Sequence, residues 1–151
     1  MTIANDVSKL CQCESVIARA DGACDLSGMI ATLASYDRLF GPVHMQTLSL
    51  AVLVGEALAA SGENELAQRL LQRVVRDVVR AAGPTHRVRL AALAALRDLH
   101  IKSSDLAAAI AAQSELTSCL TALAGPDSPQ TSEARSCLRS LLMRSASVAA
   151  A

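Results

Sequence analysis

The stretch that decides the fold is "AAGPTHR", residues 81–87, which places a Gly-Pro pair in a chain rich in Ala, Val and Leu. Gly83-Pro84 interrupts a helix, because proline lacks a backbone N–H and glycine disfavours a helix interior. The same pair occurs at Gly41-Pro42 and Gly125-Pro126, so the interruption recurs at equal intervals along the chain. A fixed period of roughly 20–50 residues is typical of proteins built from stacked repeats.

Each segment between two of these breaks reads as two helices. Its apolar residues recur three and four positions apart, which is the period of a helix with one buried face. In the middle unit they are Leu50, Leu53, Val54, Ala57 and Leu58, then Leu66, Leu70, Leu71, Val74 and Val78. Ser61-Gly62 separates the two helices, and Thr47 is expected to cap the first one. The next unit repeats this order, with a break at "KSSD" (102–105).

The recurring order predicts an all-α fold, an α-solenoid of three helix-turn-helix repeats. Two helices alone leave apolar faces uncovered, whereas stacking the next unit covers them and a final helix closes the open end. The expected repeats are residues 3–40, 41–82 and 83–124, with a capping helix over 130–144. Residues 1–144 then form a single domain, and 145–151 are expected to be a flexible tail.

The composition agrees with this and narrows the function. Of the 151 residues 52% are hydrophobic but only 1% are aromatic, so the core must be aliphatic, as suits helices better than sheets. A net charge of zero argues against nucleic acid as the main partner. The five cysteines have no disulfide-framework spacing, which indicates reduced thiols in the cytoplasm. The sequence predicts neither a signal peptide nor an apolar run of about 18 residues. We therefore expect no membrane partner.

Small and apolar residues of the middle unit carry a family resemblance. Gly55, Leu58, Gly62 and Ala67 are spaced like the small and bulky positions of the tetratricopeptide repeat family, and "GPVHMQT" (41–47) follows a break. With its 42-residue period, the chain resembles the long repeats of kinesin light chains and many bacterial repeat proteins. The third unit departs from the pattern, with Arg97 for a small residue and Ser104 for the turn glycine. The resemblance implies a protein-binding scaffold.

The reactive side chains favour structural roles over chemistry. His44 and His86 occupy the same place in successive links, so we expect them to cap or pack there instead of forming a metal or acid–base pair. Cys11 and Cys13 would point apart on a helix and cannot easily hold one ion. No nucleotide-binding loop or activated nucleophile stands out. The sequence therefore predicts no catalytic residue, no cofactor and no metal, and hence no enzyme.

Two surfaces are candidates for binding a partner. The first is the concave face, lined by the first helix of each unit, which would present Lys9, Gln12, Arg19, Ser49, Val52, Glu56, Ala91, Ala94, Asp98 and Lys102. The second is a stripe of arginines within about 60° of one another on a helix, Arg69, Arg73, Arg76 and Arg80. Arg87 and Arg89 follow it in the link between units. This stripe is either a solvated helix face or a docking surface for an acidic partner.

The sequence thus favours a non-catalytic interaction module, a scaffold or adaptor that binds a protein or a peptide on its concave face. The alternative is a regulatory or sensor component of a signalling or transcription system that acts through a separate effector. Three repeats are close to the minimum for a stable stack, so pairing of two copies through an open end is also expected.

Overall fold

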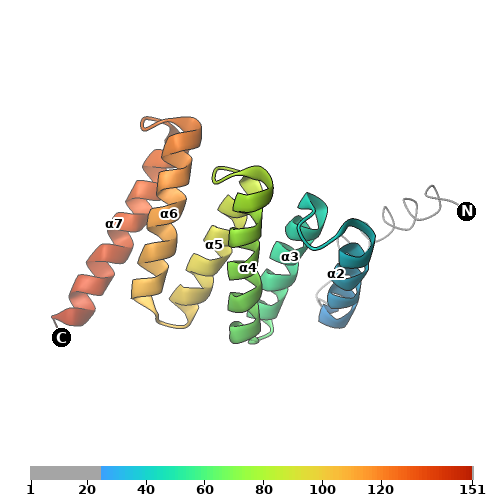
Figure 1. Cartoon of the computed structure of the whole chain (residues 1–151). Helices are drawn as coiled ribbons and strands as arrows, with labels where there is room; N and C mark the ends of the chain where they lie inside the picture. Colours follow the sequence, from blue (N-terminus) through green and yellow to red (C-terminus); the bar gives the residue numbers. More distant parts are fainter. Residues whose placement is uncertain (1–24, 151) are drawn as a thin grey trace, which may run out of the picture.

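The computed structural model describes residues 25–150, and within that range all regular structure is helical. The helices are α2 (Leu26–Phe40), α3 (Met45–Ala60), α4 (Asn64–Ala82), α5 (Arg87–Lys102), α6 (Leu106–Ala124) and α7 (Pro129–Ala149). They stand side by side in chain order, with α2 and α7 at opposite ends of the row (Figure 1). The prediction of an all-α fold is confirmed.

Each helix packs against the next one in the chain, and α3 also contacts α5. This last contact places α3 and α5 next to each other, with α4 packed against both. Buried aliphatic residues of α3, α4 and α5 form a continuous core that reaches Ala112 on α6. Its members are Leu48, Ala51, Val52, Leu71, Val74, Val78, Val88, Ala92, Leu96 and Ala112.

The three Gly-Pro breaks have the same backbone geometry. Gly41, Gly83 and Gly125 have φ angles of 90°, 90° and 89° and ψ angles of 160°, 172° and 164°. Each donates its N–H to the carbonyl four residues earlier at 3.1 Å. An L side chain rarely adopts this backbone conformation, so glycine is required at all three positions. The equal spacing of the breaks in the sequence therefore corresponds to a link built three times in the same way.

The two link histidines cap helices. The Nδ1 atom of His44 accepts the N–H of Gln46 at 3.3 Å, and that of His86 accepts the N–H of Val88 at 3.2 Å. These bonds satisfy one of the free N–H groups at the start of α3 and of α5. The expectation that both histidines serve the link is confirmed.

The expectation that Thr47 caps α3 is wrong, because His44 takes that place and α3 begins at Met45. Thr47 is buried inside α3, where its Oγ1 donates to the carbonyl of Tyr36 at 3.4 Å. Thr131 is likewise buried inside α7, and its Oγ1 donates to the carbonyl of Gly125 at 2.8 Å. These threonines hold a helix to the segment before it.

The turn within each unit is also repeated. Ser61 and Ser103 end α3 and α5, and each hydroxyl donates to the carbonyl four residues earlier at 3.0 Å. The following residue has a left-handed backbone, with φ of 88° at Gly62 and 61° at Ser104. The serine that departs from the family pattern therefore adopts the backbone that the pattern assigns to glycine.

Two helices differ from what the sequence indicates. α7 extends to Ala149, beyond the expected end at residue 144, because "SASVA" contains no glycine or proline to interrupt it. Within residues 25–150, α6 is long and apolar enough to cross a bilayer, although no such helix was expected. Only 22% of this apolar stretch is buried within the structure, although α6 packs against both α5 and α7.

Candidate functional site

The structure places most of the predicted concave-face residues at the surface of α3 and α5. Ser49, Glu56, Ala91, Asp98 and Lys102 are exposed and Ala94 is half-buried. Val52 differs: it is only 5% exposed and belongs to the core, so it is not available to a partner. Lys9, Gln12 and Arg19 lie outside the described residues.

Glu56 on α3 and Asp98 on α5 act on each other electrostatically. Partial burial raises the pKa of Glu56 above its usual value, and the negative charge of Asp98 raises this pKa further. Burial disfavours the charged carboxylate, and a nearby like charge does the same. The contact between α3 and α5 thus brings together two carboxyl groups that the sequence assigns to one face.

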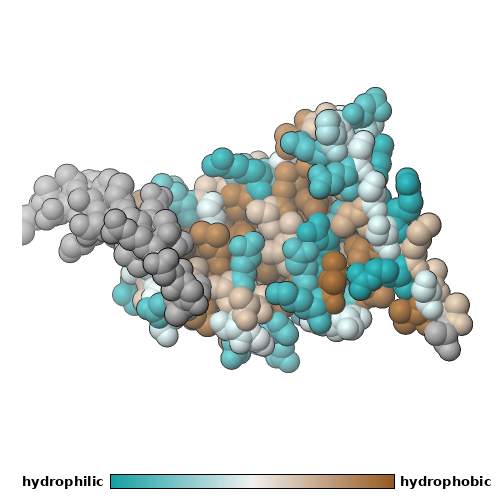
Figure 2. All heavy atoms as spheres, turned by 180° about the vertical axis from the view of Figure 1, so that it is seen from behind, coloured by the Kyte–Doolittle hydropathy of each residue, from teal (hydrophilic) through white to brown (hydrophobic). Residues whose placement is uncertain are grey.

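A groove of about 490 Å³ lies between α5 and α7, with α6 at its base. Its lining combines aliphatic and polar side chains, namely Arg97, Asp98, Ile101, Gln113, Leu116, Leu120, Gln130, Glu133, Ala134 and Cys137. Asp98 is the one residue of the predicted concave set among them. A space-filling view from behind shows apolar and hydrophilic residues side by side along the row of helices (Figure 2).

Arg97 anchors a hydrogen-bond network at the base of this groove. Its Nη1 donates to Oε1 of Gln113 at 3.0 Å, and its Nε donates to Oδ1 of Asp98 at 2.8 Å. Gln113, which is 1% exposed, donates its Nε2 to the carbonyl of Ala134 at 2.9 Å. The network links α5, α6 and α7 and fixes the Arg97 guanidinium in the groove.

Sequence reasoning identified Arg97 only as a departure from the repeat pattern. At the equivalent place in the preceding unit, Gly55 leaves room for Leu71, since a Cβ at Gly55 would lie 2.8 Å from Leu71 Cδ2. The long side chain of Arg97 is accommodated because Gln113 stands where Leu71 stands and accepts a hydrogen bond from it. Comparing the pair Gly55 and Leu71 with the equivalent pair Arg97 and Gln113 in the sequence would have revealed the polar contact between α5 and α6.

The predicted arginine stripe lies on α4 and is partly neutralised by its own helix. Arg69 pairs with Glu65 at 3.7 Å. Asp77 pairs with Arg73 at 3.3 Å and with Arg80 at 3.8 Å. Among the four, Arg76 has no ion pair within the described part of the chain.

Arg89, which the sequence places in the link, lies instead inside α5 and is only 7% exposed. Arg89 occupies the place in its unit that the buried residues Thr47 and Thr131 occupy in the units on either side. Its Nη1 donates to the carbonyl of Pro84 at 2.9 Å and to Sγ of Cys119, and its Nη2 pairs with Glu115 at 3.0 Å. Its Nε is buried without a hydrogen-bond partner. The arginine in place of threonine was the signal for this buried charge.

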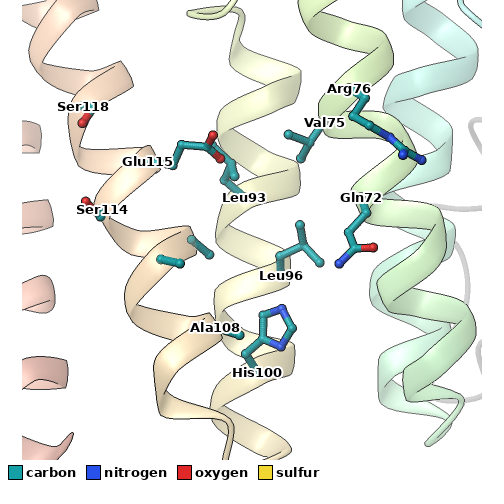
Figure 3. A pocket seen from close by; sticks show the side chains of 12 residues that line it. Gln72, Val75, Arg76, Leu93, Leu96, His100, Ala108, Ser114, Glu115 and Ser118 are labelled. Atoms are coloured by element: carbon teal, nitrogen blue, oxygen red, sulfur yellow. The ribbon is translucent and has the colours of Figure 1, made fainter.

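A larger groove, of about 720 Å³, lies between α4 and α6 over α5 (Figure 3). Its apolar lining includes Val75, Leu93 and Leu96, while Gln72, Arg76, His100, Ser114, Glu115 and Ser118 add polar groups and Ala108, Ala111 and Ala112 complete the α6 wall. Over residues 25–150, no group of three or more His, Cys, Asp or Glu side chains is arranged to hold a metal ion.

No known protein-family model matches this chain. None of the curated proteins is significantly similar to it.

Proposed function

We propose that this chain is a non-catalytic interaction module that binds a protein or peptide segment on the face formed by α3, α5 and α7. In this proposal the chain is an α-solenoid of three tetratricopeptide-like repeats, and α7 caps the end of the stack. Such a stack provides an extended surface on which one helix of each repeat contributes side chains.

The repeated geometry of the links supports the solenoid. Three equally spaced glycines share one backbone conformation, and two histidines cap the following helices in the same way. A regular link sets a regular rotation between units, so corresponding side chains of successive units fall on one face.

The observation that carries the proposed binding face is the electrostatic effect of Asp98 on Glu56. These residues occupy equivalent places in successive units, each is exposed, and the charge of one raises the pKa of the other. The face therefore holds two neighbouring carboxyl groups, of which Asp98 is already paired with Arg97 on its own helix at 2.8 Å. An approaching cationic group would stabilise the charged form of Glu56. We infer that the bound segment carries Lys or Arg opposite these carboxylates.

The proposal is tested by affinity capture from the source cell with quantitative mass spectrometry, comparing the wild type with Glu56→Arg/Asp98→Arg. Proteins bound on this face are expected to be depleted at least about tenfold by the double reversal, because rim charges both attract and orient a partner. Circular dichroism of both proteins shows that folding is unchanged.

A matched control is Glu63→Arg/Glu65→Arg, which makes the same change in net charge at two exposed positions on either side of the start of α4. Recovery of the same proteins at the same level by the wild type and by both variants would overturn the proposal.

A further inference from the structure

We propose a second docking site that goes beyond the function proposed above: the groove between α4 and α6 binds an amphipathic helix of a partner protein with acidic residues on its flank. The groove lies between different helices from the proposed binding face. Three observations carry the proposal, which are the shape of the groove, a histidine whose ring is open to the groove, and an arginine in its wall that has no ion pair among the described residues.

The shape of the groove suits a helix. α4 and α6 form its walls, and Leu93 and Leu96 of α5 form its floor between them (Figure 3). The α6 wall is made mainly of small side chains, including Ala108 and Ala111, which allow another helix backbone to approach closely. Its volume, about 720 Å³, is in the range of clefts that accept several apolar side chains, and its open form suits an elongated occupant.

His100 offers a polar contact to a docked helix, because its ring nitrogens are open to the groove. It is only 8% exposed, it lines the groove from the last turn of α5, and its ring forms no hydrogen bond within residues 25–150. A polar group on a docked helix could bond to the accessible ring, and Gln72 on the α4 wall offers a second polar contact.

The charge in the groove lining that has no ion pair is positive. Glu115, the one acidic residue in its lining, is already paired with the buried guanidinium of Arg89 at 3.0 Å. Arg76 on the opposite wall has no ion pair among the described residues. Arg69 and Arg80 on the same helix are highly exposed and pair with carboxylates only at 3.7 Å and 3.8 Å, so those pairs hold them weakly. Carboxylates on the flank of an incoming helix complement this wall.

The test uses a display library of helical peptides about 15 residues long, selected against the full chain. We expect enrichment of peptides with aliphatic residues three and four positions apart and with Asp or Glu on one flank. A selected peptide, fluorescently labelled, then serves as the probe in polarisation measurements.

Two variants address the site directly. Ala111→Glu places a bulky negative charge, of the same sign as the acidic peptide, in the α6 wall, and Arg76→Glu reverses the charge of the unpaired arginine. Each variant is expected to bind the probe about tenfold or more weakly than the wild type does. Ala91→Glu on α5 and Arg139→Glu on α7 make the same charge changes at exposed positions outside the groove lining. These controls are expected to bind the probe within about twofold of wild type, because their charges lie at the periphery.

The probe should also bind normally to Glu56→Arg/Asp98→Arg, which separates this proposal from the function proposed above. Failure to enrich acidic amphipathic peptides would overturn the inference. Equal binding by Ala111→Glu, Arg76→Glu and the wild type would overturn it as well. So would a selected peptide that binds the α3–α5 face, or a self-association of the chain that Ala111→Glu abolishes, since a second copy would then be the occupant.

Discussion

Arg97 on α5 and Gln113 on α6 are joined by a 3.0 Å hydrogen bond at the positions where, in the preceding unit, Gly55 and Leu71 pack together without polar atoms. The same helix–helix contact is therefore built in two ways. In one unit a missing side chain makes room for a leucine, and in the next a buried amide receives a guanidinium. Within each pair, the effect of one substitution on the free energy of unfolding should therefore depend on the residue at the other position.

For the polar pair, we expect Gln113→Leu to destabilise the protein by about 1–3 kcal/mol, because Arg97 loses a buried acceptor and the carbonyl of Ala134 loses a donor. Adding Arg97→Gly recreates the apolar pair of the preceding unit. The double variant should recover part of the loss, with a coupling of about 0.5 kcal/mol or more. Urea denaturation of the four proteins measures this cycle, and strictly additive effects would contradict it.

For the apolar pair, we expect Gly55→Ala to destabilise the protein by about 1–3 kcal/mol, even though alanine is the better helix former. The added Cβ would lie 2.8 Å from both Cγ and Cδ2 of Leu71, which is too close without a shift of α3 or α4. Thermal unfolding measures the loss. Leu71→Ala should cost less in the Gly55→Ala background than in the wild type; a stabilised Gly55→Ala protein would show that the contact is not tight.

In the turn after α5, replacing Ser104 is expected to stabilise the protein. Ser104 has a φ of 61°, whereas Gly62 at the equivalent place has 88°. A left-handed backbone costs an L residue about 1 kcal/mol, so Ser104→Gly is expected to raise the free energy of unfolding by up to that amount. Gly62→Ser should lower it by a similar amount. Ser103→Gly, at a residue with a φ of −80°, is the control and should not stabilise.

The stability of the protein should depend on pH through Glu56. Its pKa is raised first by burial and then by Asp98, so the folded protein holds this proton more tightly than the unfolded chain does. The stability that this proton contributes is present at low pH and is lost as the pH rises from the usual value of 4.5 through the raised one. Glu56→Gln should therefore gain stability relative to wild type at neutral pH but not at about pH 3.

Urea midpoints of the wild type and of Glu56→Gln at both pH values measure this difference. A carbon NMR titration of the Glu56 carboxyl in Asp98→Asn should show a lower midpoint than in the wild type, because one of the two causes of the raised pKa is removed. A stability difference that does not change with pH would contradict the prediction.

Local features of this protein could be predicted from the sequence with little error. The Gly-Pro pairs end helices because of their own backbone restrictions, and α4 ends at Ala82, the last residue of the expected middle repeat. The role of His44 and His86 followed from their equal places after two such pairs. The Thr47 cap was wrong because several residues near a helix start can accept an N–H, and only the backbone angles decide which one does.

The candidate sites were less predictable, because they depend on neighbours that are distant in the sequence. Periodicity placed Val52 on a groove-lining face, but the contact between α3 and α5 buries it. Arg89 read as part of a basic link, yet it is covered by α6 and held by Glu115.

The sequence by itself determined the helices, their breaks and their regular order, since these follow from the preferences of single residues and of neighbours within a turn or two. The tertiary structure alone decided which side chains are covered and which line a groove. Each such outcome depends on the residue that the adjacent helix presents at the contact, as Gln113 does for Arg97 and Leu71 does for Gly55.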